Sequence, residues 1–270
     1  MAIIEFNVAG GGLERPYFIL SERDLRHENL FMAESPYVIE RALDAGIRPV
    51  SFLAERRNMD WISEHVLPHY PEVPVVAGNK EELSSITGYS LTRGLLCVME
   101  RPKPSSFSEV AKGARRLCVL YDVCDATNVG AIFRSAAALG FDAVVLSRSA
   151  CDPLSRRAIR TSMGTVFQLP WCKCDDVLAD LKNVGFSSVC TALNHKSISL
   201  EDFPITRDGR YGVIFGEEGY GLPEKVISQS DFTVSIPMRP GVDSLNVGAA
   251  AAIILWHFRP LSPNIGLQRP

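Results

Sequence analysis

The sequence lacks the features that mark membrane and secreted proteins. Its longest uncharged apolar run, residues 247–256, is much shorter than the ~20 residues that span a bilayer. The first residues, MAIIEFNVAGGG, lack the basic stretch and long apolar segment that are typical of a secretory signal. We therefore expect a cytoplasmic protein with no membrane partner, in which residues 247–256 form a buried helix.

The sequence also lacks the pattern of a zinc site. Its seven cysteines are an odd number, and none of them forms a CxxC pair. Cys172 and Cys174 form one CxC, but no second pair of ligands accompanies it. Reduced thiols in the core are the simpler interpretation, and we expect no metal.

Three common catalytic signatures are missing. No GxxxxGK[ST] segment is present, and no GxGxxG opens a helix after a first strand, so the usual signatures of nucleotide hydrolysis and NAD chemistry are absent. No GxSxG elbow is present either, and His195 and His257 lie in no serine–histidine context. The sequence therefore gives no support for an NTPase, a dehydrogenase or a serine hydrolase.

A strong excess of one charge is missing as well. The net charge is −3; residues 1–105 carry 11 Lys+Arg against 15 Asp+Glu, and residues 106–270 carry 17 against 16. Any nucleic-acid-binding surface must therefore be local. The densest basic stretch, opposed nearby only by Asp152, consists of Arg148, Arg156, Arg157 and Arg160. A solvated helix face is the simpler interpretation of these arginines.

The sequence does contain the composition and the alternating pattern of an α/β protein. With 270 residues, 46% of them hydrophobic and 22% charged, the chain is long enough for two domains with sizeable cores. Helical and extended patterns alternate on both sides of RPKPSSFSEVAKG at 101–113, a segment typical of an exposed connection. The alternating buried strands and helices predict a mostly parallel sheet covered on both faces. The predicted division is a small α/β domain over 1–105, a linker over 106–116, a second domain over 117–260 and a tail over 261–270.

Three polar loops follow predicted strands of the second domain. They are DVCDATNVGAIFRSAAALG at 122–140, VIFGEEGYGLP at 213–223 and IPMRPGVDSLNVGAAAA at 236–252. Ligands of open parallel sheets bind at the carboxyl ends of the strands, so we expect these loops to meet at one site.

The first two loops offer groups suited to binding a phosphate or to proton transfer. In the first, Asn128 can cap a helix and Arg134 can hold a phosphate near the helix start. An ordinary turn with a solvated arginine is the alternative. In the second, Glu217 or Glu218 can accept hydrogen bonds or a proton.

The third loop leads into the last helix. Its prolines and Gly241 impose an irregular turn, and Asp243 or Ser244 is expected to cap the helix. Ser244 and Asn246 would present a hydroxyl and an amide to the same pocket. A plain capping role for Ser244 is the alternative.

Taken in this order, the three segments closely resemble the motifs of the SpoU (TrmH-like) branch of the SPOUT methyltransferases. The motifs are Asn-x-Gly-x-x-x-Arg at 128–134, Gly-x-Glu-Gly-x-Gly-Leu at 216–222, and Ile-Pro-Met followed by Ser-Leu-Asn-Val at 236–247. The resemblance covers about residues 117–258. Two positions depart from the family pattern, because Glu217 stands where asparagine is common and Gly248 where serine is common.

The resemblance implies a fold and a cofactor that periodicity cannot reveal. Family members have a deep trefoil knot, in which the second and third loops fold through one another to bind S-adenosylmethionine in a bent shape; true knots are otherwise rare. They act as homodimers whose active site is completed across the interface. Residues 1–105 more loosely resemble the ribosomal-protein-like RNA-binding domain that precedes the catalytic domain in many members. The implied partner is a structured rRNA or tRNA.

Carried over by position, the resemblance also implies the site residues. The positions that match the family's catalytic set are Asn128, Arg134, Glu218, Ser244 and Asn246, with Asn128 supporting Arg134. The positions that match its cofactor-binding set are Gly216, Ile236 and Leu245, which act through their backbone, and Thr191 at a strand end.

The implied reaction is methyl transfer to a ribose 2′-hydroxyl, a weakly acidic group that must lose a proton. In the family the counterpart of Arg134 is proposed to be the base, but an arginine stays protonated at ordinary pH. We therefore favour phosphate binding by Arg134, with the proton passing to Glu218, to water or to a transiently neutral Arg134. The alternatives are an RNA-binding protein without catalysis and an enzyme that methylates a base nitrogen.

Overall fold

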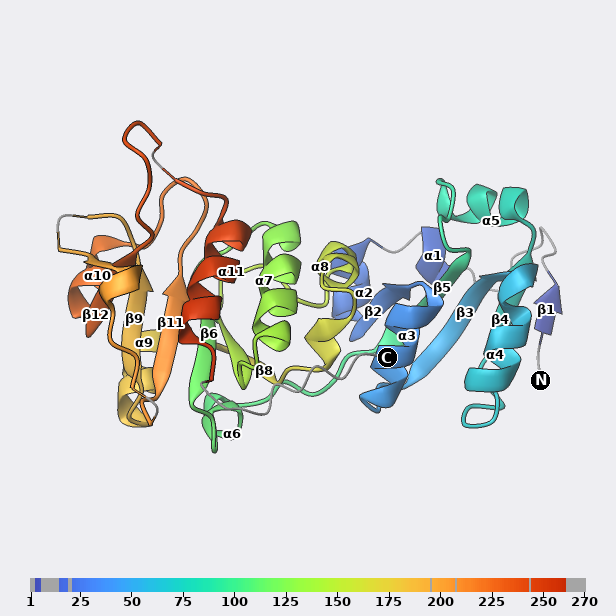
Figure 1. The fold of residues 1–270 in the computed structure, drawn as a ribbon. Helices are drawn as coiled ribbons and strands as arrows, with labels where there is room; N and C mark the ends of the chain where they lie inside the picture. Colours follow the sequence, from blue (N-terminus) through green and yellow to red (C-terminus); the bar gives the residue numbers. More distant parts are fainter. Residues whose placement is uncertain are drawn as a thin grey trace. The chain divides into compact units, whose positions relative to one another are not determined.

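The structure is a computed structural model that describes residues 3–5, 15–18, 21–194, 196–206, 208–242 and 244–260. The chain forms two compact units, one of Met1–Lys103 with Asp152–Gln168 and one of Pro104–Cys151 with Leu169–Pro270. Figure 1 labels the elements of both. The boundary lies next to the predicted one, but residues 152–168, which were predicted to belong to the second domain, pack with the first unit.

The first unit is built on a five-stranded mixed sheet in the order β1-β4-β3-β5-β2. Strands β1, β4 and β3 pair in parallel, whereas β5 is antiparallel to both of its neighbours, β3 and β2. The strands are β1 (Ile3–Glu5), β2 (Leu30–Glu34), β3 (Pro49–Glu55), β4 (Val75–Gly78) and β5 (Leu95–Glu100). The helices are α1 (Arg15–Phe18), α2 (Glu22–His27), α3 (Pro36–Asp44), α4 (Met59–His65), α5 (Lys80–Thr87) and α8 (Arg156–Thr161), with 3₁₀ helices at Arg56–Asn58 and Thr165–Phe167.

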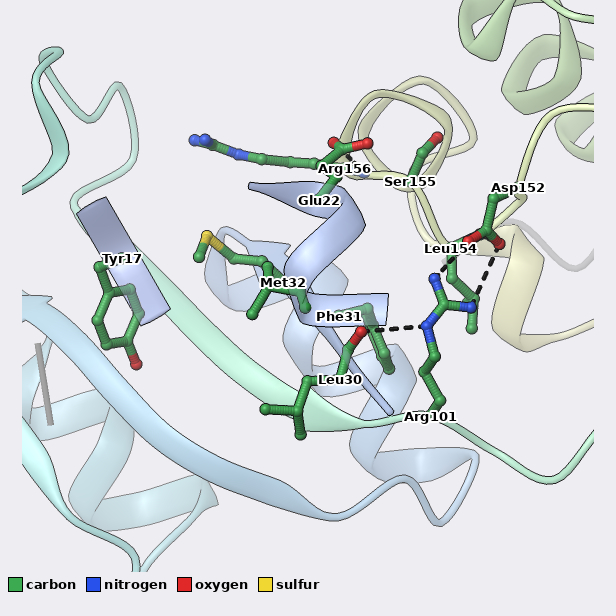
Figure 2. Close-up of a pocket in the computed structure, with 11 residues that line it drawn as sticks. Tyr17, Glu22, Leu30, Phe31, Met32, Arg101, Asp152, Leu154, Ser155 and Arg156 are labelled. Atoms are coloured by element: carbon green, nitrogen blue, oxygen red, sulfur yellow. Dashed lines mark hydrogen bonds and ion pairs between the residues drawn. The ribbon is translucent and has the colours of Figure 1, made fainter. Parts of the chain in front are cut away.

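Residues 152–168 are fixed to the first unit by polar contacts around a small cavity, shown in Figure 2. The Arg101 guanidinium binds the Asp152 carboxylate, and Arg101 Nε donates to the Leu30 carbonyl oxygen at 3.1 Å. The backbone N–H of Arg156 donates to Glu22 at 2.9 Å. The cavity, of about 90 Å³, can hold a few waters but is too small for a nucleotide. Periodicity could not predict this return of the chain, because it depends on contacts such as Arg101–Asp152 between residues 51 positions apart.

The second unit is built on a seven-stranded sheet in the order β10-β12-β9-β11-β6-β7-β8, in which all neighbouring strands are parallel. The predicted α/β class with a mostly parallel sheet is confirmed. The strands are β6 (Arg116–Leu120), β7 (Ala143–Ser147), β8 (Trp171–Cys174), β9 (Ser187–Thr191), β10 (Ile198–Ser199), β11 (Tyr211–Phe215) and β12 (Phe232–Ser235). The helices are α6 (Phe107–Ala111), α7 (Ala126–Ala138), α9 (Val177–Asn183), α10 (Glu224–Gln229) and α11 (Val247–Phe258), with a 3₁₀ helix at Leu200–Asp202.

Helices cover both faces of this sheet. Figure 1 shows α7 and α11 side by side on one face, where they pack against each other. Residues of α6, α9 and α10, including Val110, Leu181 and Val226, form a hydrophobic cluster with Val119 and Val145 of the strands. Because β6, β7 and β11 are buried along their whole length, their sequences are mostly apolar, apart from Arg116 at the start of β6 and Ser147 at the end of β7. In the described part of the chain, no helix is long and apolar enough to cross a membrane.

The segment predicted as a linker, 106–116, contains the helix α6 and ends on the first residue of β6. Ser106 caps α6 in a capping box with Glu109, and Val110 and Ala111 are buried against the second unit. This Ser-x-x-Glu signal was present in the sequence, but it lies in a stretch rich in proline and serine that favoured a loop. Strands β8 and β10 were not predicted, because runs of four and two residues carry too little pattern.

Candidate active site

The carboxyl ends of β9, β11 and β12 open into one pocket of about 650 Å³. The loops after β11 and β12 and the start of α11 form its walls, as expected for ligand binding at the carboxyl ends of parallel strands. A cavity of this size suits a nucleoside-sized ligand. It is lined by residues 191–193, 215–222, 234–236 and 244–247, together with Ile227, Met238, Ala250 and Ile254.

The loop after β11 folds tightly on itself because of its glycines. A Cβ on Gly216 would lie 2.6 Å from the backbone carbonyl carbon of Gly221, so only glycine fits there. Gly219 and Gly221 have φ angles of +97° and +70°, which other residues rarely adopt. The Gly221 N–H also donates to the Glu217 carbonyl oxygen at 2.9 Å. The loop is therefore a close-packed wall of the pocket.

A chain of hydrogen bonds joins the three loops. Nδ2 of Asn246 donates to Oδ1 of Asn128 at 3.0 Å, and Nδ2 of Asn128 donates to Oε1 of Glu218. Oδ1 of Asn246 accepts from the backbone N–H groups of Gly248 and Ala249 at 3.0 and 3.3 Å. Each amide therefore has a fixed orientation, with its oxygen accepting and its nitrogen donating. These contacts confirm that the three loops meet at one site.

The predicted cap of α7 was wrong by one turn. Asp125 caps this helix, since its Oδ1 accepts from the backbone N–H groups of Thr127 and Asn128 at 2.6 and 3.1 Å. Asn128 therefore lies in the first turn of α7, and its side chain binds Glu218 and Asn246. Asp-Ala-Thr-Asn contains three residue types that favour the N-cap position, and sequence alone did not distinguish them.

The predicted cap of α11 was also wrong. Asn246 caps this helix, whereas Ser244 lies two residues earlier and is exposed. The other candidate, Asp243, lies outside the described residues. Asn246 thus has two tasks, because its oxygen caps α11 while its nitrogen orients Asn128.

Seven predicted site residues line the pocket: Glu218 and Asn246 of the hydrogen-bond chain, together with Thr191, Gly216, Ile236, Ser244 and Leu245. Oγ1 of Thr191 donates to the Ile214 carbonyl oxygen at 2.9 Å, which fixes its side chain at the end of β9. Leu245 is 39% exposed and presents an apolar surface to the pocket. The lining therefore combines backbone polar groups with apolar side chains.

Arg134 is a predicted site residue that the chain does not bring to its own pocket. It is exposed on α7 and is not among the lining residues. Six positions separate it from Asn128, which corresponds to about 240° around an α-helix. The two side chains therefore leave α7 in different directions, and Asn128 binds Glu218 and Asn246 rather than Arg134.

Asp122, two residues after the end of β6, was not predicted as part of the site. It has a left-handed backbone with a φ of 57°, and its carboxylate accepts from the hydroxyls of Ser147, at 2.7 Å, and Ser149. These hydrogen bonds fix the start of the loop that leads to Asn128. An aspartate two residues after one buried strand, with Ser-x-Ser ending the next, is the signal that could have found it.

Comparison with known proteins identifies the family to which this arrangement belongs. Residues 115–256, just over half of the chain, match the model of the SpoU rRNA Methylase family. The chain belongs to this family. Membership confirms the resemblance carried by the three motifs, and it makes the chain an RNA methyltransferase that uses S-adenosylmethionine.

Relatives of this SpoU-family chain cover most of its length. It is 32% identical over 241 residues to an uncharacterized tRNA/rRNA methyltransferase of Mycobacterium tuberculosis, covering 88% of this chain and 83% of that protein. It is 25% identical over 242 residues to RlmP of Bacillus subtilis, a 23S rRNA (guanosine(2553)-2′-O)-methyltransferase, covering 88% and 92%. The fold matches an AdoMet-bound rRNA methyltransferase from Sinorhizobium meliloti with a TM-score of 0.82 at 23% identity, covering 94% of this chain and 97% of that one.

Proposed function

We propose that this SpoU-family chain methylates a ribose 2′-hydroxyl of rRNA or tRNA. The main observation in its support is the pair of hydrogen bonds that join Asn128, Glu218 and Asn246, which come from three separate loops beside one pocket. Methyl transfer needs two reactants held in line, and a fixed polar chain next to a cofactor pocket provides for that. The name of the Bacillus subtilis relative supports a ribose oxygen as the acceptor.

The pocket suits S-adenosylmethionine in size and in chemistry. Leu222, Ile227 and Ile254 line the pocket with apolar side chains that would suit an adenine ring, and the close-packed glycine loop would offer backbone polar groups. When bound, the cofactor supplies an electrophilic methyl group. The residues that we propose to hold it are Thr191, Gly216, Ile236 and Leu245.

The chain's own side chains orient the acceptor hydroxyl and take its proton. Asn128 holds one oxygen of the Glu218 carboxylate, and we assign proton acceptance to this carboxylate. Asn246 keeps Asn128 in orientation, while the exposed Ser244 offers a hydroxyl to the RNA at the mouth of the pocket. Because an arginine stays protonated, we assign phosphate binding to Arg134.

A homodimer completes the site in this proposal. Arg134 does not line the pocket of its own chain, so Arg134 of the partner subunit is the candidate to reach it. On α11, Ile253 is 43% exposed and Trp256 is 58% exposed. Large apolar side chains exposed on one helix favour a protein interface.

Two finer structural features also belong to the proposal. The trefoil knot is supported by the family motifs at 216–222 and 236–247, whose loops both line the pocket. An RNA-binding role for residues 1–105 is supported by the relatives that match across most of the chain.

Incubation with total RNA and labelled S-adenosylmethionine tests the reaction. Alkali cleaves RNA only where the 2′-hydroxyl is free, so ribose methylation is expected to give labelled alkali-resistant dinucleotides. Label in modified bases would replace the proposal with base methylation, and RNA binding without label would indicate a non-catalytic protein. Glu218→Gln keeps the size of the side chain but cannot take the proton, so it should lose the label and still bind the cofactor.

A further inference from the structure

The first unit gains its strongest basic segment from the second half of the chain. Residues 1–103 carry 11 Lys+Arg against 15 Asp+Glu. Residues 152–168, which pack with them, add three arginines and one aspartate. Figure 1 shows α8 beside α2 and β2, and α8 packs on β2. Three of the four arginines that the sequence suggested to be a solvated helix face therefore lie on an otherwise acidic unit, whereas Arg148 belongs to the second unit and pairs with Asp175.

One end of α8 forms an arginine–tyrosine stack. The guanidinium carbon of Arg156 lies 4.6 Å from the ring centroid of Tyr89 and is held there by Glu34, at 2.9 Å from Arg156 Nη2. Burial raises the pKa of Tyr89, and the positive charge of Arg156 opposes that rise. Arg160 lies one helical turn after Arg156, on the same side of α8. Tyr89 is nevertheless 38% exposed, so part of its ring remains open.

A second stack lies beyond the other end of α8. The guanidinium carbon of Arg41 lies 4.3 Å from the ring centroid of Tyr37, and Arg41 Nη1 donates to the Met163 carbonyl oxygen at 2.7 Å. Gly164 permits this contact, because a Cβ there would lie 3.2 Å from Arg41 Cδ. Tyr37 is 47% exposed. Near each end of α8, a tyrosine ring is therefore stacked on an arginine and remains partly exposed to solvent.

Between the two stacks, α8 presents arginines to solvent. Arg157 and Arg160 are exposed, and neither pairs with a carboxylate within the described part of the chain. The carboxylate of Glu34 is already taken by Arg156. On α3 the exposed acids Glu40 and Asp44 offset the positive charge of Arg41. The net positive charge of this face therefore lies on α8.

We propose that this face, the α8 strip (Tyr37, Arg41, Tyr89, Arg156, Arg157 and Arg160), binds an unpaired segment of the RNA substrate. Exposed tyrosine rings stack on bases that are not already stacked in a helix, and unpaired arginines bind the phosphates between them. Protein interfaces are also enriched in tyrosine and arginine, so the choice of RNA rests on the family to which the chain belongs. The proposal rests on the RNA methyltransferase function and names the surface of the first unit that binds the RNA.

Two kinds of variant separate the phosphate contacts from the stacking. Arg157→Ala/Arg160→Ala removes two charges, so RNA affinity should fall and the slope of log affinity against log salt should become shallower by about 1.4, at about 0.7 per phosphate on single strands. Tyr89→Leu should weaken binding by roughly 5- to 150-fold without changing that slope, since one stacked base is lost. Tyr89→Phe keeps the ring and should restore the affinity.

Fluorescence anisotropy with a labelled mixed-sequence single-stranded RNA, and with its duplex, measures these effects. The matched control, Lys112→Ala/Lys182→Ala, removes two exposed charges from the other unit and should leave affinity for the single strand nearly unchanged. Wild-type protein should prefer the single strand. In methylation assays the α8 strip variants should raise KM for RNA and leave kcat and cofactor affinity unchanged.

The outcomes distinguish this inference from the proposed function. If the wild-type protein methylates RNA and the strip variants bind it with unchanged affinity and salt slope, the α8 strip is not the RNA surface and the enzymatic proposal stands. If no RNA is methylated but the variants weaken binding as expected, the strip stands and the enzymatic proposal fails. Equal loss in the lysine control would show a non-specific charge effect and overturn the strip.

Discussion

Arg134 is exposed on α7, away from the lining of its own pocket, so its charge is available to RNA rather than to the cofactor. We predict that Arg134→Ala abolishes methylation, by roughly 100-fold or more, because a misplaced phosphate misaligns the acceptor hydroxyl. Cofactor affinity should stay nearly unchanged in calorimetry. A loss of cofactor binding would contradict the assignment of Arg134 to the RNA.

Substitution of Gly216, unlike that of Arg134, is expected to lower cofactor affinity, because Gly216 is part of the wall of the cofactor pocket. A Cβ at this position meets the backbone of Gly221 at 2.6 Å, and backbone cannot move aside as a flexible side chain can. We predict that Gly216→Ala weakens S-adenosylmethionine binding by roughly 10-fold or more, as overpacking displaces the loop. Calorimetry measures the affinity, and far-UV circular dichroism should show that the fold is retained. Unchanged affinity would remove this loop from the cofactor site.

At the scale of elements, the start of α11 links helix stability to catalysis through Asn246. Asn246→Ala removes the cap from Gly248 and Ala249 and should cost about 1 kcal/mol of unfolding free energy. Asn246→Asp keeps a capping oxygen but cannot donate to Asn128, so it should retain stability and still lose roughly 10- to 100-fold in kcat. Urea titration and single-turnover assays measure the two effects. Full activity in the aspartate variant would show that Asn128 needs no such donor.

The outer face of α11 gives a prediction about assembly. Trp256, 58% exposed, would be buried in the proposed dimer, and a glutamate there would bury a charge without a partner. We predict that Trp256→Glu shifts the mass measured by light scattering from twice 29.7 kDa to 29.7 kDa and abolishes methylation. Lys182→Glu on α9 is the surface control and should stay dimeric. A dimeric, active Trp256→Glu protein would place the interface elsewhere.

At the scale of the whole molecule, buried thiols couple stability to alkaline pH. Burial raises the pKa of Cys190 to about 11 and that of Cys172 to about 12. In the unfolded chain a thiol ionises near pH 8.5. Their contribution to stability is therefore complete below about pH 8.5 and is lost as the pH rises toward the folded-state values.

We predict that the free energy of unfolding, measured by urea titration, falls above about pH 8.5. Each of these thiols should add about 1.4 kcal/mol per pH unit to the slope, since the unfolded state releases a proton that the folded state keeps. Cys172→Ala/Cys190→Ala should have a shallower slope, although its stability at neutral pH is lower. An unchanged slope would mean that these thiols ionise in the folded chain.

Local pattern was sufficient for the elements whose residues interact mainly with their sequence neighbours. The buried runs of β6, β7 and β11, the amphipathic α3 and the apolar α11 all lie where periodicity predicted them. The three motifs could be recognised from the sequence, because some of their residue types are required by the local backbone: Gly216 by a close contact with Gly221, and Asn246 by the cap of α11. Short elements such as β8 could not be predicted, since four residues carry little pattern.

The sequence by itself determined the α/β class, the family and the identity of the polar residues in three loops. Only the tertiary structure decided that Asn128 reaches Glu218 and Asn246, which lie 90 and 118 positions away, and that Arg134 points elsewhere. It also decided that residues 152–168 carry their arginines to the first unit. The physical reason is the range of the interactions: propensity and periodicity reflect contacts over a few residues, whereas these arrangements depend on which distant groups satisfy one another's hydrogen bonds and charges.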